Sequence, residues 1–163
     1  MDEAAFDALY NASFRRLVGQ VYAMCGNLAE AQDCVQEAFV RAWDKRRTLN
    51  RDGSPEAWVR TTACRLAVSR WRRTKLALRL TDRSQRPAPP AEPSVNHVAL
   101  DRALATLSPD QRRAIVLYHL ADLSVAEVAQ EMDVPLGTVK AWLSRGRAAL
   151  ARLLDDPAEG RLT

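Results

Sequence analysis

Cationic side chains follow a short helical pattern near the end of the chain, and their chemistry is that of binding an acidic polymer. Residues 124–145 read SVAEVAQEMDVPLGTVKAWLSR, two short helices joined by a tight turn, and the second helix is basic. A helix of this kind fits the major groove of DNA, where cationic groups meet base edges and phosphates. Its polar face carries Lys140, Ser144, Arg145, Arg147 and Arg152. The pattern predicts a DNA-reading helix, and a helical hairpin with a solvated basic face is the alternative.

Start and stop signals position this basic helix. Ser124 and Glu127 have the spacing of a capping box, which fixes the beginning of the first short helix. Residues 134–137, Val-Pro-Leu-Gly, interrupt that helix, because proline restricts its predecessor and glycine tolerates angles that other residues avoid. Thr138 is then expected to be the N-cap of the second helix. The apolar positions expected to be buried there are Val139, Leu143, Leu150 and Leu154.

A second concentration of positive charge lies in the middle of the chain. Residues 60–86 contain nine basic residues and one acid, although the whole chain of 163 residues carries a net charge of only +4. This asymmetry indicates a polyanion contact separate from the first, and a solvated basic helix is the alternative. Trp58 and Trp71 lie among these arginines, a combination that suits single-stranded or melted nucleic acid. Trp58 is equally a candidate for the core.

Helical periodicity organises the first half of the chain. An apolar stripe predicts a helix over residues 3–25, ended by Gly26, and a second helix runs from an Asn27 cap to near Arg47. The outer face of that second helix keeps Asp33, Gln36, Glu37, Val40 and Asp44, which form either a partner surface or an ordinary exposed face. The polar, turn-rich residues 48–55 separate it from a third helix, expected from about Glu56 to Arg73.

Composition changes sharply after the third helix. Residues 82–97 hold four of the eight prolines, which predicts a flexible, extended linker. Beyond it we expect a helix from Val98 to Leu107, and then a helix capped by Ser108 with Pro109 at its first position. The expected fold class is therefore all-α: two small helical domains joined by a flexible Pro-rich linker, the second containing the helix-turn-helix. We find no repeats and expect no strands.

Several functional classes are disfavoured by what the sequence lacks. No apolar run approaches the ~20 residues of a membrane span, and no secretion signal is present, so we expect a cytoplasmic protein. Cys25, Cys34 and Cys64 lack metal-ligand spacing, and we expect neither a disulfide nor zinc. His97 and His119 have no Cys or His neighbour at ligand spacing. We therefore expect no enzyme site, no cofactor and no metal.

Three segments together resemble the extracytoplasmic function (ECF) sigma factors of bacterial RNA polymerase, within the sigma-70 family. They read DCVQEAFVRAWDK at 33–45, SPEAWVRTTACRLAVSRWRR at 54–73, and LSPDQRRAIVLYHLADLSVAEVAQEMDVPLGTVKAWLSRGRAAL at 107–150. Their order and spacing cover almost the whole chain. The resemblance implies that residues 1–75 bind core polymerase and recognise and melt the −10 element. It implies that residues 76–97 form a linker and that residues 98–163 recognise the −35 element.

The resemblance also implies roles for individual residues. The surface that grips the clamp coiled coil of the largest polymerase subunit would comprise Asp33, Gln36, Glu37 and Val40. The loop at 49–54 would capture a flipped base, and −10 recognition and melting would involve Asn50, Arg51, Ser54, Trp58, Arg60, Arg65, Arg70, Arg72 and Arg73. The −35 element would be recognised by Thr138, Lys140, Ala141, Ser144, Arg145 and Arg147, with Thr138 and Arg147 toward the DNA backbone.

The resemblance implies partners as well. These are the polymerase clamp and β flap, promoter DNA and a cognate anti-sigma factor, with nucleoid association in the holoenzyme. Arg65 and Ser69 depart from the Asn and Asp that many relatives have, which affects the details of −10 reading. Two other hypotheses are a stand-alone helix-turn-helix regulator, which would bind duplex DNA tightly without polymerase, and a helical adaptor, which would bind no DNA.

Overall fold

The computed structural model describes residues 1–51, 53–80 and 95–155, and for residues 95–98 it describes the backbone alone. The chain divides into two compact units, Met1–Ala91 and Glu92–Thr163, here called unit 1 and unit 2. The described residues form helices without strands, which confirms the expected all-α class. The centre of the expected linker, at 81–94, lies outside the described residues, as does Asp52 of the expected base-capturing loop.

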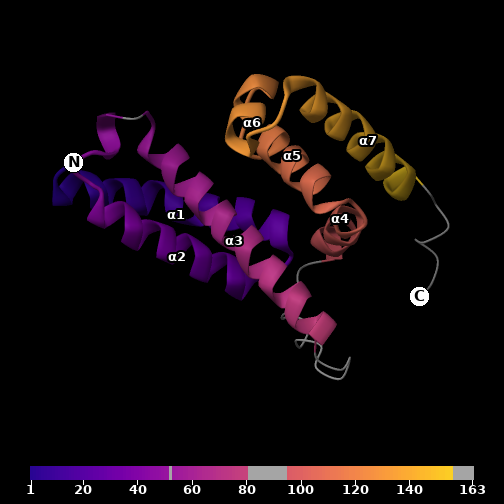
Figure 1. Ribbon diagram of the computed structural model, residues 1–163, viewed down its shortest axis with the longest axis horizontal. Helices are drawn as coiled ribbons and strands as arrows, with labels where there is room; N and C mark the ends of the chain where they lie inside the picture. The colour runs from indigo at the N-terminus through magenta and orange to yellow at the C-terminus, as the bar shows by residue number, and fades with distance from the viewer. Residues whose placement is uncertain (52, 81–94, 156–163) are drawn as a thin grey trace. The chain divides into compact units, whose positions relative to one another are not determined.

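Unit 1 is built from α1 (Glu3–Cys25), α2 (Leu28–Asp44), the short 3-10 helix η1 (Leu49–Arg51) and α3 (Pro55–Leu80). Figure 1 shows α1 and α2 side by side, with α3 packed along them. Gly26 ends α1 in a left-handed conformation at φ 72°, which glycine adopts without strain, and the Asn27 side chain caps α2. The fully buried core between these helices includes Leu17, Val21 and Val35.

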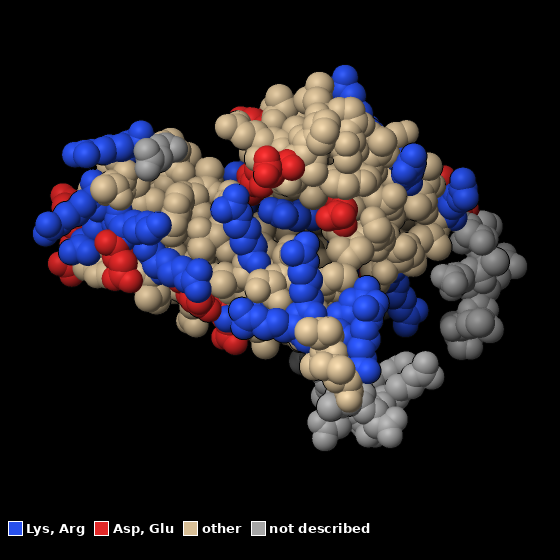
Figure 2. All heavy atoms as spheres, viewed as in Figure 1, with Lys and Arg blue, Asp and Glu red and all other residues tan. Residues whose placement is uncertain are grey.

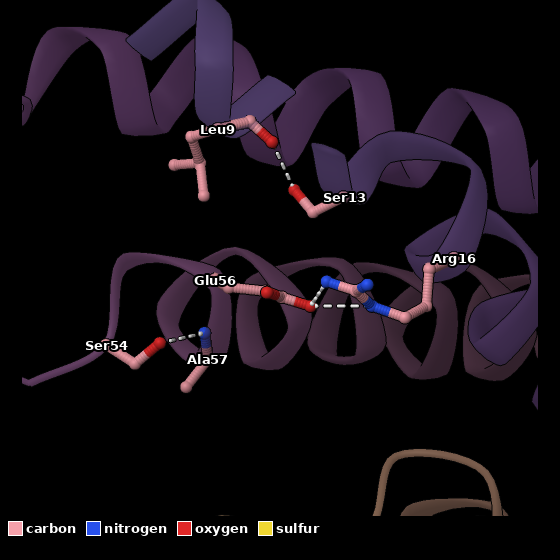
Figure 3. Close-up of polar contacts among 6 residues, drawn as sticks. All are labelled: Leu9, Ser13, Arg16, Ser54, Glu56 and Ala57. Atoms are coloured by element: carbon pink, nitrogen blue, oxygen red, sulfur yellow. Dashed lines mark hydrogen bonds and ion pairs between the residues drawn. The ribbon is translucent and has the colours of Figure 1, made fainter. Parts of the chain in front are cut away.

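Polar contacts fix the start of α3 against α1, as Figure 3 shows. Ser54 Oγ accepts a hydrogen bond from the Ala57 N–H at 3.4 Å, at the first turn of α3. Arg16 of α1 donates from Nε and Nη2 to the same Glu56 carboxylate oxygen, at 3.0 and 2.5 Å. These contacts set the position from which α3 passes along the core.

Unit 2 contains α4 (Val95–Ala105), α5 (Pro109–His119), α6 (Val125–Met132) and α7 (Leu136–Asp155). The expected caps are present: Ser108 caps α5, and Ser124 with Glu127 forms a complete capping box on α6. Helices α5 and α7 pack closely at Gly146. A Cβ at this position would lie only 3.0 Å from Ile115 Cγ1, so the close packing requires glycine or a shift of Ile115. This glycine fills a buried position of α7 that was not among the expected core residues.

Helix boundaries differ from expectation at several places. Helix α2 ends at Asp44 and not near Arg47, because the following N–H groups form 3-10 type bonds, such as Lys45 N to Ala42 O at 3.1 Å. Helix α4 begins at Val95, three residues earlier than expected. Helix α3 continues seven residues beyond Arg73, since residues 74–80 are mostly good helix formers without proline or glycine.

The turn into α7 also differs from expectation. Thr138 is not its N-cap: α7 begins at Leu136, and Thr138 N already donates to the Pro135 carbonyl at 3.0 Å. The left-handed residue of the turn is Asp133, at φ 55°, and not Gly137. Aspartate tolerates this region better than most residues. At the far end of α7 Leu154 is exposed, contrary to expectation, because the helix there extends past its packing partners.

Candidate nucleic-acid interface

A groove of about 620 Å³ lies between the end of α2 and the middle of α3 in unit 1. Arg41 and Asp44 of α2, and Lys45 at the C-cap of that helix, contribute to its lining. Six further lining residues share one face of α3, at helical spacing: Trp58, Thr62, Arg65, Leu66, Ser69 and Arg73. The lining thus combines one aromatic and one aliphatic side chain with four cationic side chains, two hydroxyl groups and the carboxylate of Asp44.

The groove combines the two features that bind unstacked nucleotides. Trp58 is partly buried against the core and also lines the groove, which agrees with a core role and leaves its contact with nucleic acid a prediction. Lys45 Nζ lies 5.6 Å from the centre of that ring, a cation–π contact. Bases stack on exposed aromatic faces while cations hold the phosphates, and the arrangement suits a single strand.

Positive charge continues beyond the groove along α3. Trp71, Arg72, Lys75 and Arg79 are all exposed there, and Lys75 lies over the Trp71 ring at 4.8 Å. Figure 2 shows Lys and Arg side chains gathered over α3 on the visible face of unit 1. This face is a broad electrostatic surface for a polyanion.

The residues predicted to contact the −10 element fall into separate groups. Trp58, Arg65 and Arg73 line the groove, and Arg72 is exposed outside its lining. Arg60 is buried, 7% exposed, on the side of α3 that carries Val59 and Cys64. The resemblance placed Arg60 among the residues of −10 recognition; its burial contradicts an exposed phosphate contact, because its position on α3 turns the side chain into the core.

Arg70 is also engaged within unit 1. It donates from Nη2 to Glu37 Oε2 at 2.9 Å, between α3 and α2. In the expected base-capturing loop, Asn50, Arg51 and Ser54 are exposed, while Leu49 is buried and anchors the segment to the core. Gly53 has φ 114°, a conformation that requires glycine.

Several lining residues of the groove were not predicted from the sequence. Arg41, Lys45, Thr62, Leu66 and Ser69 were not among the predicted site residues, and Asp44 was placed only on the outer face of α2. The signal that would have found the α3 members is their repeat with Trp58 at intervals of three and four residues. The α2 members gave no such signal, because their place beside α3 follows only from packing.

The expected polymerase-binding face of α2 is mostly exposed. Asp33, Gln36 and Val40 are exposed, and Val40 retains 62% of its accessible surface, a large value for an apolar side chain. Glu37 is only partly exposed, because its carboxylate binds both Arg41 and Arg70. It thus lies at the edge between this face and the groove.

In unit 2, the polar face of α7 presents several of the predicted −35 residues. Lys140, Ser144 and Arg145 are exposed, while Thr138 and Ala141 are partly buried. Arg147 is exposed but held: its Nε donates to His119 Nε2 at 3.2 Å, and its guanidinium lies 5.1 Å from the centre of the Tyr118 ring. Burial first, and the charge of Arg147 second, lower the pKa of His119 from its ordinary 6.5.

Two of the three cysteines are buried in the core of unit 1. All three are reduced, and Cys34 and Cys64 are fully buried between helices. Burial raises the pKa of Cys34 to about 11, so its thiol is protonated at neutral pH. Among the residues that the structure describes, no group of three or more Cys, His, Asp or Glu is placed to hold a metal ion, and no helix is long and apolar enough to cross a membrane.

Comparison with known families assigns a class to each unit. The description "Sigma-70 region 2" fits residues 9–77, and "Sigma-70, region 4" fits residues 97–150. These two regions, in this order, define a two-domain sigma factor of the sigma-70 class. SigL of Mycobacterium tuberculosis is 31% identical over 163 residues, which cover 95% of this chain and 92% of SigL. SigW of Bacillus subtilis is 29% identical, with 95% and 91% covered.

The chain belongs to the ECF RNA polymerase sigma factors. It is an alternative sigma factor that directs promoter-specific transcription initiation. This confirms the resemblance drawn from the sequence, and the hypotheses of a stand-alone regulator and of an adaptor are set aside.

Solved structures share the fold. The sigma factor RpoE, solved with the anti-sigma factor NepR from Bartonella quintana, matches at a TM-score of 0.77 and 23% identity, covering 94% of this chain and 98% of RpoE. CnrH, solved with the cytosolic domain of CnrY, matches at 0.66 and 23%, covering 94% and 90%.

Proposed function

We propose that the two units divide promoter recognition between them. Residues 1–75 bind core polymerase and recognise and melt the −10 element, residues 98–163 recognise the −35 element, and residues 76–97 connect them. The family assignment supports this division, since its region 2 and region 4 descriptions fall on the two units. The protein needs no catalysis of its own in this role, because the polymerase performs the chemistry.

The groove between α2 and α3 is the observation that carries the −10 assignment. Trp58 and Leu66 offer a stacking surface, and Arg41, Lys45, Arg65 and Arg73 surround it with cations. Unstacking a base costs a few kcal/mol, which stacking and phosphate contacts offset. The exposed Asn50, Arg51 and Ser54 form a neighbouring surface for a flipped base, and Arg72 adds a phosphate contact.

For the −35 element, the exposed polar face of α7 supplies the contacts. Arg145 is exposed, and the forked donor geometry of a guanidinium suits a bidentate contact with guanine. Lys140 and Ser144 flank it on the same face, with Ala141 between them. Thr138 and Arg147 lie at the two ends of this surface, where the DNA backbone would pass.

Core polymerase would contact the α2 face of Asp33, Gln36, Glu37 and Val40, and its β flap would contact unit 2. An anti-sigma factor is a further proposed partner, because RpoE was solved with the anti-sigma factor NepR and CnrH was solved with the cytosolic domain of CnrY. A location in the cytoplasm, on the nucleoid when in holoenzyme, follows from this role.

The test is run-off transcription with bacterial core polymerase on a promoter library, with and without this protein. We expect new start sites only in its presence, and permanganate-reactive thymines over the −10 element. Trp58→Ala and Arg65→Ala should reduce strand opening. Arg15→Ala is the matched control, since Arg15 is an exposed arginine of α1 outside the groove. Unchanged start sites would refute the function, and equal effects of all three variants would refute the groove assignment.

A further inference from the structure

One carboxylate in unit 1 binds two arginines at once. Glu37 Oε1 accepts from Arg41 Nη2 at 2.5 Å, and Glu37 Oε2 accepts from Arg70 Nη2 at 2.9 Å. The first pair lies within α2, four residues apart, while the second joins α2 to α3. Each oxygen of the carboxylate is thus engaged with a different guanidinium.

These three residues connect two surfaces with different proposed partners. Arg41 lines the groove, and Arg70 is among the residues for which the resemblance implies a part in −10 recognition and melting. Glu37 belongs to the α2 face proposed to bind polymerase, one turn after the exposed Asp33. The acid that engages both arginines is therefore itself part of the docking face.

We propose that Glu37 is a positioning residue that holds Arg41 and Arg70 away from nucleic acid until the α2 face is docked. A basic surface that binds Asp33 and Glu37 competes for the carboxylate and releases both guanidinium groups to the phosphates of the strand. The inference rests on the proposed function, because it assumes that α2 docks on polymerase and that the groove receives DNA.

The exposure of the three side chains makes such an exchange feasible. The side chain of Glu37 is 38% exposed, that of Arg41 52% and that of Arg70 32%, so water and ions reach both pairs. Ion pairs of this kind are weak and exchange partners readily. Each arginine released to a phosphate adds one counterion-releasing contact, which strengthens binding and steepens its dependence on salt.

The first experiment measures binding of the full chain, without polymerase, to a fluorescent single-stranded oligonucleotide of −10 type. Glu37→Gln keeps the size of the side chain and removes its charge, and we expect roughly three- to tenfold tighter binding with a steeper salt dependence. Asp33→Asn is the matched control, because it removes the same charge one turn away and Asp33 forms no ion pair with a described residue. If both variants bind the oligonucleotide more tightly by the same factor, the effect comes from net charge alone, and the proposal is overturned.

A double-mutant cycle tests whether Glu37 acts through the arginines. Arg41→Ala should weaken oligonucleotide binding more in the Glu37→Gln background than in the wild-type background, because only there is Arg41 released. The same should hold for Arg70→Ala. Additive effects would overturn the proposal. If Glu37 merely joins α2 to α3, Glu37→Gln lowers the melting temperature and leaves oligonucleotide affinity unchanged, which also overturns it.

The third arm uses holoenzyme at saturating core polymerase. In holoenzyme, Glu37→Gln and wild type should bind the oligonucleotide with equal affinity, because docking has already released the arginines in both. An undiminished advantage in holoenzyme would overturn the link to docking. Failure of the proposed function is recognised separately, since wild-type holoenzyme would then give no promoter-dependent transcripts.

Discussion

Arg147 of α7 donates a hydrogen bond to His119 at the end of α5, with 3.2 Å between Arg147 Nε and His119 Nε2. The acceptor must be a neutral imidazole nitrogen, so the proton of the neutral ring lies on Nδ1. The contact joins α7, which carries the proposed −35 residues, to α5. Because histidine titrates near neutrality, the contact depends on pH.

Thermal stability should therefore fall as pH decreases below about 6.5. Burial and Arg147 lower the pKa of His119 in the folded protein, so the unfolded chain binds the proton more readily. The stabilisation is present above 6.5 and is lost as pH falls through the folded pKa. Melting curves from pH 8 to pH 5 should show a smaller decrease for His119→Gln, which accepts from Arg147 without titrating. Equal decreases for His119→Gln and the wild type would contradict this assignment.

Arg145→Ala should relax sequence preference at one position of the −35 element. Loss of a bidentate base contact costs about 1 to 3 kcal/mol at that position. Arg72→Ala should instead weaken binding almost equally on all promoters, as expected for a phosphate contact of the exposed part of α3. Competition transcription on a promoter library separates the two patterns, and a uniform loss from Arg145→Ala would contradict the base contact.

Asp44 is the acid among the described residues that line the groove, and Asp44→Asn should change both affinity and preference. Removal of its charge should tighten single-strand binding, because phosphates are no longer repelled. It should also reduce any preference for bases with an exocyclic amino group. A carboxylate can only accept hydrogen bonds and so favours these amino donors, whereas the Asn side chain can both accept and donate. Asp33→Asn, about 16 Å away along α2, is the control. Identical oligonucleotide titrations for the two variants would contradict the role of Asp44.

Gly146→Ala should destabilise unit 2, because the new Cβ would lie 3.0 Å from Ile115 Cγ1 and 3.1 Å from its Cδ1. Overpacking of this kind costs about 1 to 3 kcal/mol. Gly137→Ala is the matched control: a Cβ there meets nothing within 4 Å, and alanine favours the helix by up to about 1 kcal/mol. Denaturant unfolding of the two variants should give shifts of opposite sign.

Local signals in the sequence predicted much of the fold. The caps at Asn27, Ser108 and Ser124 depend on neighbours three residues away, so spacing alone reveals them. The turn before α7 was placed correctly but assigned to the wrong residues. Both Asp133 and Gly137 tolerate a left-handed conformation, and only the packing of α6 against α7 decides between them.

Contacts between helices were not predictable in the same way. Glu37 and Arg70 are 33 residues apart, and their pairing depends on the angle at which α3 crosses α2. Arg60 belongs to a run of arginines that looks uniformly exposed, yet the rotation of α3 buries this member and exposes Arg65. The charge pattern therefore identified the basic helix but did not divide its residues between core and groove.

The fully buried thiols of Cys34 and Cys64 give unit 1 an internal reporter of its own opening. A thiol reagent reaches neither side chain unless the helices separate, and the high pKa of Cys34 suppresses reaction further. The rate of alkylation at Cys34 and Cys64, followed separately from that at the partly exposed Cys25, then measures how often the helices of unit 1 separate. Docking on a partner or occupation by a nucleotide strand should slow that rate, so simple chemical labelling follows assembly without any attached dye.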